Sequence, residues 1–280
     1  MQKLVLMAVM LFIFGAVAAQ EKPTLCVDNF TNSTSRSNVA VKNLRNEVIA
    51  GINATGRLTL VDVNTLGNLP SAVNERVKVL NEKGIDFVLR GTLNSIEEKT
   101  SQSSDNKTTY YGAVVNYTLT VIDAETGETL ASETDKESWT TGETRDEAIL
   151  KAIESVKSNM KKFVDNNFKV EATVKALDQA DDKKGAKTVY VSVGSAMGIS
   201  KGQIFEVYSE VHVAGESVRK KIGELRAREV MSGTLTLCDV KSGGKEIKAA
   251  FESGTKMSVV SRAKVTFLDK VNKGLDKIIE

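Results

Sequence analysis

Four aspartates stand at the ends of predicted strands, where paired carboxylates could carry acid–base chemistry. They are Asp28, Asp62, Asp86 and Asp123. Acid–base catalysis needs a carboxyl group held within reach of the proton that it transfers. Aspartate is also a common cap of turns and helices, because its carboxylate accepts hydrogen bonds from nearby backbone N–H groups. No catalytic constellation forms around these four, so we expect each of them to cap a turn or a helix.

The remaining residue types that support catalysis are scarce. His212 is the sole histidine, and triads and multi-histidine metal sites need an imidazole at a defined place. It falls in a predicted alternating strand, where an exposed position is expected. The glycine-rich residues 194–202 lack the Gly-Lys-Ser/Thr ending of a phosphate loop, and residues 51–56 lack a third glycine at dinucleotide-binding spacing. We therefore predict no catalytic residue, no metal site and no cofactor, and we expect a protein that is not an enzyme.

Two cysteines, Cys26 and Cys238, lie in apolar alternating segments that are predicted to be strands of different domains. An exported protein can form disulfides. However, cysteine in an apolar strand usually acts as a small buried hydrophobic residue. We expect two buried thiols, with a disulfide as the alternative. The two positions are too far apart in the sequence to indicate a zinc site.

The amino terminus predicts a secretory signal peptide over residues 1–19. Lys3 supplies the positive charge, residues 4–14 are apolar, and residues 15–19 are small, which leaves Gln20 as the expected new terminus. The apolar stretch is shorter than the ~20 residues of a spanning helix, so an uncleaved anchor is the lesser alternative. No cysteine stands at the cleavage point, and we therefore expect no lipid anchor there. The chain is predicted to be exported.

Length and charge narrow the class of partner. The chain has 280 residues, enough for one large or two ordinary domains, with 38 basic and 36 acidic residues. This balance gives no basic field for nucleic acid and no polybasic attraction to anionic lipid. We therefore expect no nucleic-acid partner.

Residues 20–167 predict an α/β domain with a mixed sheet. Val41, Leu44, Val48 and Ile52 recur at helical spacing. The predicted order is strand, helix, strand, helix, three strands and a long helix, at residues 24–30, 39–52, 58–62, 71–83, 85–96, 111–122, 129–139 and 145–164.

Three polar residues are the predicted caps of these helices. They are Asn38, Ser71 and Thr144. Gly56 and Gly84 are predicted to end the first two helices, because glycine accepts a left-handed conformation.

The sequence pattern changes after residue 167 to short alternating segments, and residues 168–263 therefore predict a small β-rich domain. Short alternating strands are expected at residues 168–177, 188–193, 203–213, 221–230 and 234–240, with no helix before Lys264. Residues 264–280 predict an amphipathic carboxy-terminal helix. The fold class is therefore α+β: an α/β domain, a small all-β SH3-like barrel and a terminal helix.

The first domain resembles a known family. The segments around Asp28-Asn29-Phe30, Gly56 to Asp62, Gly84 to Gly91 and Val121 to Glu128 resemble, in this order, the curli production assembly/transport (CsgG-type) domain and the amino-terminal domain of TolB. The segment from Gly198 to Tyr208 resembles the carboxy-terminal SH3-like domain of flagellar assembly protein T, which carries a TolB-like domain directly before it.

The resemblance implies a role in the cell envelope. We expect an exported, non-enzymatic accessory or assembly protein that contacts envelope proteins in the periplasm or at the outer membrane, and homo-oligomerisation stays open. One alternative is a subunit of a curli-type outer-membrane secretion channel. The other is a periplasmic ligand- or glycan-binding protein.

Three regions are expected to dock partners. The first is the surface around residues 31–38, and the second is an edge of the second domain, since a free sheet edge accepts an added strand. The third is the terminal helix, through an apolar stripe that either binds a partner or packs on its own domain: Phe267, Val271, Leu275 and Ile278.

Overall fold

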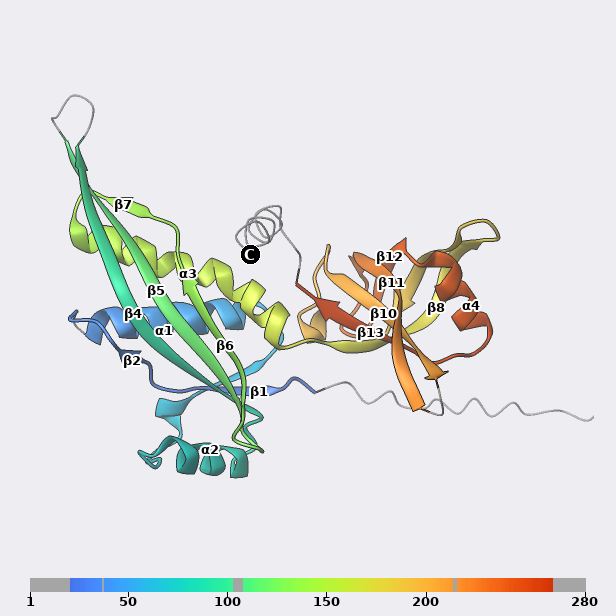
Figure 1. The fold of residues 1–280 in the computed structure, drawn as a ribbon, viewed down its shortest axis with the longest axis horizontal. Coiled ribbons are helices and arrows are strands. Elements are labelled where there is room, and N and C mark those ends of the chain that lie inside the picture. The colour runs from blue at the N-terminus through green and yellow to red at the C-terminus, as the bar shows by residue number, and fades with distance from the viewer. Residues whose placement is uncertain (1–20, 37, 103–107, 214–215, 264–280) are drawn as a thin grey trace, which may run out of the picture.

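The structure, a computed structural model, describes residues 21–36, 38–102, 108–213 and 216–263. The first part is a seven-stranded mixed sheet with three helices, and the second is a closed barrel (Figure 1). The strands of the sheet are β1 (Thr24–Val27), β2 (Thr31–Asn32), β3 (Thr59–Asp62), β4 (Phe87–Gln102), β5 (Thr109–Asp123), β6 (Thr129–Lys136) and β7 (Thr140–Gly142). The helices are α1 (Asn38–Ala54), α2 (Val73–Glu82) and α3 (Arg145–Asn167).

The sheet runs in the order β3-β1-β4-β5-β6. β1 pairs in parallel with β3 and β4, whereas β4, β5 and β6 are antiparallel neighbours. β2 adds to β4 and β7 adds to β5. The long β4–β5 hairpin extends beyond the helices, as Figure 1 shows. The predicted mixed sheet is confirmed.

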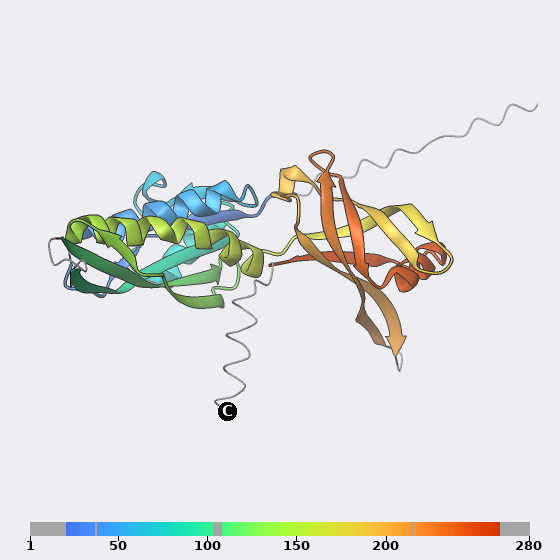
Figure 2. The same ribbon diagram turned by 90° about the horizontal axis from the view of Figure 1, so that it is seen from above.

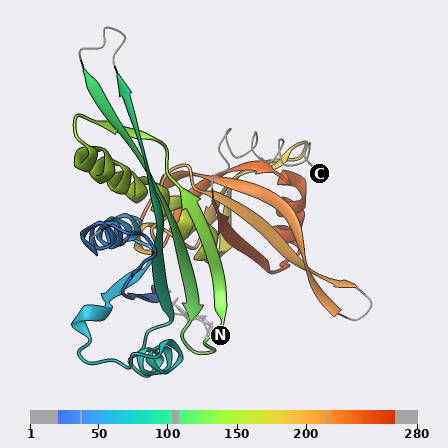
Figure 3. The same ribbon diagram turned by 60° about the vertical axis from the view of Figure 1, so that its left-hand side comes forward.

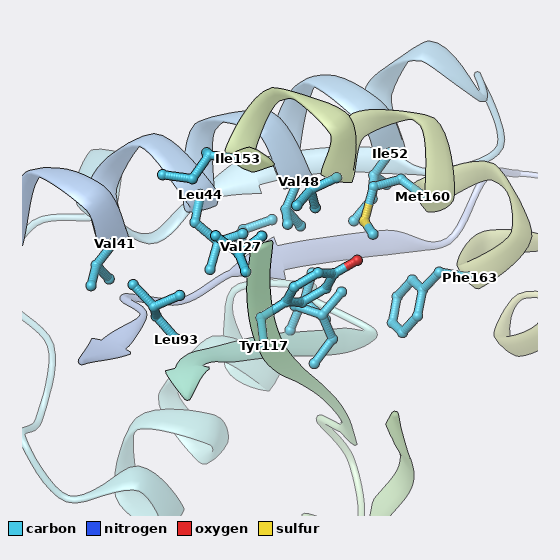
Figure 4. Close-up of a cluster of buried hydrophobic side chains, with 14 of the residues drawn as sticks. Val27, Val41, Leu44, Val48, Ile52, Leu93, Tyr117, Ile153, Met160 and Phe163 are labelled. Carbon is cyan, nitrogen blue, oxygen red and sulfur yellow. The ribbon is translucent and has the colours of Figure 1, made fainter. Parts of the chain in front are cut away.

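Helices α1 and α3 cover one face of the sheet (Figures 1 and 2). Their apolar stripes meet the strands in one core, which includes Val48, Ile153 and Tyr117 (Figure 4). The two helices approach closely at Gly51, where an added Cβ would lie 2.6 Å from Met160 Cγ. Helix α2 covers the other face at the end where β4 begins, over a smaller core that contains Val88 and Ile122. Among the described residues, no helix covers the rest of that face (Figure 3).

The second part is a six-stranded barrel in the order β10-β11-β12-β9-β8-β13. Its elements are β8 (Glu171–Asp181), β9 (Gly185–Val191), β10 (Ile204–Val213), β11 (Glu216–Val230), β12 (Thr236–Ser242), α4 (Gly244–Glu252) and β13 (Met257–Arg262). Antiparallel pairs join consecutive strands around the ring, and Phe205, Leu225 and Val259 fill its core.

Several predictions need correction. The second domain is not all-β, because helix α4 lies before Lys264, where no helix is expected. The strand β13 also lies in a stretch for which no strand is predicted. Ser71 does not cap α2: Ala72 holds the cap position and makes no side-chain cap bond. Asn38 is the first residue of α1 and not a residue before it. The Thr144 cap is confirmed, since its side chain accepts from the Glu147 N–H.

Candidate functional site

The uncovered face of the sheet is the first part of the candidate site, and we call it the open face. Alternation along β4, β5 and β6 sends one row of side chains to the α1/α3 core and the other row to this side. Leu89, Leu119 and Val121 are in the core row. The buried Val114 lies in this second row of β5, opposite Glu97. The polar and aromatic residues of the open face are Thr31, Arg90, Thr92, Asn94, Glu97, Lys99, Tyr110, Asn116, Thr118, Thr120, Ser132, Thr134, Lys136 and Trp139.

Hydroxyl and amide groups cross the open face from strand to strand. Thr31 and Thr92 share a hydrogen bond of 2.7 Å between β2 and β4. The Asn94 amide donates to Thr118 Oγ1 at 2.8 Å, and Thr118 pairs with Thr134 at 2.8 Å. Asn94 reaches across because the β4–β5 register shifts between Leu93 and Ser95. The result is a row of neutral polar groups that runs over four strands.

Two aromatic side chains lie at the upper end of the open face, which is the end nearest the connection between β4 and β5. Trp139 and Tyr110 are each about two-fifths exposed, at 42% and 41%. Lys99 Nζ lies 4.3 Å from the centroid of the Trp139 ring, within the range of a cation–π contact. Gly112 permits this arrangement, because an added Cβ there would lie 2.8 Å from Lys99 Cγ and 3.4 Å from Trp139 Cε3.

The free edge of β6 is the second part of the candidate site. β6 pairs with β5 from Thr129 to Lys136, and its other side has no strand partner among the described residues. The first half of β6, residues 129–132, has no charged side chain, and Leu130 is 55% exposed. The second half carries Glu133, Asp135 and Lys136. Unpaired backbone groups at such an edge can accept another strand.

A buried carboxylate fixes the chain just after β6. Glu137 is 8% exposed and accepts from Tyr117 Oη at 3.0 Å and from Asn159 Nδ2 at 2.8 and 2.9 Å. Burial raises the pKa of Tyr117, and so does the negative charge of Glu137, so the phenol stays protonated and donates. These bonds tie β6 and β7 to α3, and the edge is therefore held in a fixed position.

The two parts of the chain meet around a buried arginine. Arg57 is 2% exposed, and its Nη1 lies 2.9 Å from Asp165 Oδ1 at the end of α3. Its Nη2 donates to Gln203 Oε1, just before β10, over 3.4 Å, while its Nε has no hydrogen-bond partner. Burial lowers the pKa of Arg57, although Asp165 opposes that shift. Beside it, Gly198 packs so closely that an added Cβ would lie 2.3 Å from the Thr55 carbonyl oxygen.

The four aspartates have structural partners. Asp62 accepts from the Asn64 N–H and pairs with Arg45 at 2.6 Å. Asp123 accepts from two N–H groups of the β5–β6 turn. Asp28 pairs with Arg76 at 2.7 Å and accepts from the N–H of the next residue.

Asp86 departs from the predicted pattern, because it accepts from the Thr24 N–H, 62 positions away, and ties β1 to the start of β4. Capping is therefore confirmed for Asp62 and Asp123. The arginine partners of Asp28 and Asp62 were not foreseen, since residues so far apart in the sequence give no local signal.

The other predicted positions divide into three groups. Cys26 and Cys238 are free and buried, as expected, and burial raises the pKa of each thiol to about 12. The surface around residues 31–38 is formed by β2 and a turn in which Asn32 Oδ1 accepts from Thr34. Phe267, Val271, Leu275 and Ile278 lie outside the described residues, and so does the predicted terminal helix.

The predicted edge of the second domain is largely absent, because the barrel closes. Free strand edges remain on the projecting part of the β10–β11 hairpin, where Val211 pairs with Val218. β13 pairs with β10 only as far as Ser209, and β12 pairs with β11 only from Glu224 onward. Within the described part of the chain, no helix has the length and apolar character to cross a membrane. The same residues contain no cluster of side chains suited to a metal ion.

The solved structures that resemble this chain cover about half of it. No protein-family model matches the sequence, and no curated protein matches it. A PelC dodecamer from Paraburkholderia phytofirmans is 18% identical, covers 50% of this chain and 87% of its own, and has a TM-score of 0.34. Lipoprotein GNA1162 from Neisseria meningitidis is 15% identical, covers 50% of this chain and 97% of its own, and also has a TM-score of 0.34.

The LpoB carboxy-terminal domain from Escherichia coli is 20% identical, covers 45% of this chain and 89% of its own, and has a TM-score of 0.29. Likenesses with such low scores carry no argument about what this chain does. The curli-type resemblance of the sequence therefore stays a prediction.

Proposed function

We propose that this chain is an exported, non-enzymatic accessory or assembly protein of the cell envelope, which works through protein–protein contacts in the periplasm or at the outer membrane. The observation that carries the proposal is the free edge of β6. This strand has eight residues, contains no proline and pairs on one side. An edge of that length is a template for strand addition by a partner.

The charge pattern of β6 indicates where the partner would pair. Natural sheets protect their edges with charged side chains. In β6 the charged residues Glu133, Asp135 and Lys136 occupy the second half, and residues 129–132 are left unprotected. An extended segment of a partner would therefore pair along residues 129–132, with Leu130 supplying an apolar contact.

The ionisable groups at the strand ends support a role without catalysis. Asp28 and Asp62, the two carboxylates that stand where parallel strands end, are each held by an arginine. A group committed to a structural ion pair is poorly placed to exchange protons with a substrate.

Cross-linking from β6 tests the proposal. Both native thiols are buried, so Ser132→Cys creates an accessible thiol that a photoactivatable maleimide can label. Irradiation of envelope extracts should then yield a specific adduct with one envelope protein, or with a second copy of this chain if the contact is homo-oligomeric. Val218→Cys is the matched control, since Val218 is an exposed strand residue of the barrel hairpin. Adducts that are equal at both positions, or absent at Ser132→Cys, would contradict the proposal.

A further inference from the structure

The open face has an unusual composition for a surface that docks proteins. Its central part is built from hydroxyl and amide side chains, which include Thr92, Asn94, Thr118 and Ser132. Protein interfaces usually have an apolar centre inside a polar rim. Here the exposed aromatic residues lie at one end, and the centre is polar.

These polar groups keep hydrogen-bonding capacity after they have bonded to one another. A hydroxyl has one donor and two acceptor sites. The Thr118–Thr134 and Thr120–Ser132 pairs, at 2.8 and 3.3 Å, each use one donor and one acceptor. Every pair therefore leaves one O–H and several lone pairs for a ligand. The Asn94 carbonyl oxygen and the Asn116 NH₂ group are likewise not used by the bond between these two amides.

The upper end of the face adds a stacking surface. Tyr110 and Trp139 are both substantially exposed, and Lys99 lies beside the indole ring. Aromatic rings are large, flat and rigid, so that they contact a ligand at little cost in conformational entropy. Gly112 keeps the strand below them free of a side chain.

Charge and length restrict the ligand further. Glu97 and Lys136 pair at 2.7 Å and offset one another, which leaves Arg90 and Lys99 as a small positive excess on the open face. Along β5, Tyr110 and Thr120 are ten residues apart, or about 34 Å at the usual rise of a strand. A ligand that fits this face is extended, rich in hydroxyl groups, and neutral or weakly acidic.

We propose that the open face binds an extended polysaccharide chain, with sugar rings against Tyr110 and Trp139 and sugar hydroxyls on the polar row from Asn94 to Thr134. Sugars present both an apolar ring face and many hydroxyl groups, and this matches the two parts of the face. The inference is independent of the proposed protein contact, which uses the backbone edge of β6 and not this row of side chains.

The sequence supplies its own reporter, because Trp139 is the sole tryptophan. Titration of the mature protein with cellohexaose, a neutral probe, and with hexagalacturonate, an acidic one, should shift the tryptophan emission in a saturable way for at least one of them. The preference between the two probes identifies the charge class of the ligand. Tyr110→Ala and Thr134→Val keep the reporter and should each weaken binding by about tenfold.

Val218→Ala, on the barrel hairpin, is the control and should leave the affinity unchanged. The two open-face variants alter exposed or half-exposed side chains, and circular dichroism of each will verify the fold. No saturable change up to millimolar concentrations of either sugar would overturn the proposal. Binding that neither Tyr110→Ala nor Thr134→Val weakens would also overturn it, as would emission changes that occur with a protein partner alone.

Discussion

Arg57 makes the energetics of the domain junction testable. In Arg57→Ala, Asp165 would stay buried and lose the partner that lies 2.9 Å away. Removal of one member of a buried pair costs roughly 3–5 kcal/mol, because the other charge is left uncompensated. Lys161 also contacts Asp165, at 2.7 Å, so we expect the lower end, about 3 kcal/mol. For a chain of this size that corresponds to a fall in Tm of about 6–12 °C.

Scanning calorimetry is the assay, since it reports on both parts of the chain. Lys161→Ala is the comparison variant: the Lys161 side chain is 55% exposed, so solvent screens its attraction to the buried Asp165 carboxylate, and we expect a smaller fall in Tm than for Arg57→Ala. Arg57→Met combined with Asp165→Leu removes both charges, and it should cost less than the sum of Arg57→Ala and Asp165→Ala. A fall in Tm below about 2 °C for Arg57→Ala, or strictly additive costs, would refute the reasoning.

Three further predictions concern acid, packing and thiols. Arg45 holds the pKa of Asp62 at about 2, below the usual 3.8, so the stability from this pair is complete above pH 3.8 and is lost as the pH falls through 2. The Tm difference between wild type and Asp62→Asn should therefore shrink over that window, and a constant difference would contradict the pairing. Gly51→Ala should lower the free energy of unfolding by about 1–3 kcal/mol in urea titrations, since the new Cβ meets Met160; Asn53→Ala, on the exposed side of α1, should not. Ellman's reagent should find no thiol in the native protein and two after denaturation, and rapid native labelling would show that the thiols are accessible.

The sequence predicts the first domain well where local patterns are strong. The apolar stripe that contains Ala148, Ile153 and Val156 predicted α3, and the Thr144 cap fixed its start. Alternation predicted β5 and β6, and Gly127 takes a positive φ of 74° in the turn between them. In these segments the local preference and the tertiary packing agree, and the pattern is therefore easy to read.

Short elements with weak patterns escaped prediction. Helix α4 has nine residues, and its apolar stripe is short: it consists of Ile247, Ala250 and Phe251, of which Ile247 alone is fully buried. β7 has three residues, Thr140–Gly142, and follows directly after the segment predicted to be a single strand over residues 129–139. The predicted strand is interrupted at Glu137, which accepts buried hydrogen bonds from Tyr117 of β5 and Asn159 of α3. Because these partners are distant in the sequence, the local pattern does not indicate the interruption.

The candidate site depends on register, which the sequence does not supply. Alternation alone places Asn116, Thr118 and Thr120 on one side of β5. It does not show that Asn94 reaches them through a register shift, or that Trp139 lies over Gly112. The junction pair of Arg57 and Asp165 is 108 residues apart in the chain, and only the fold brings the two side chains together.

Hydrogen–deuterium exchange along β6 tests the central claim most directly, because strand addition forms backbone hydrogen bonds. The isolated protein would be compared with the protein bound to the partner captured by cross-linking. Strand addition predicts that the amides of residues 129–132 gain protection in the complex while those of the barrel hairpin, residues 216–223, do not. Unchanged exchange at residues 129–132 in a complex that protects other residues would contradict the claim.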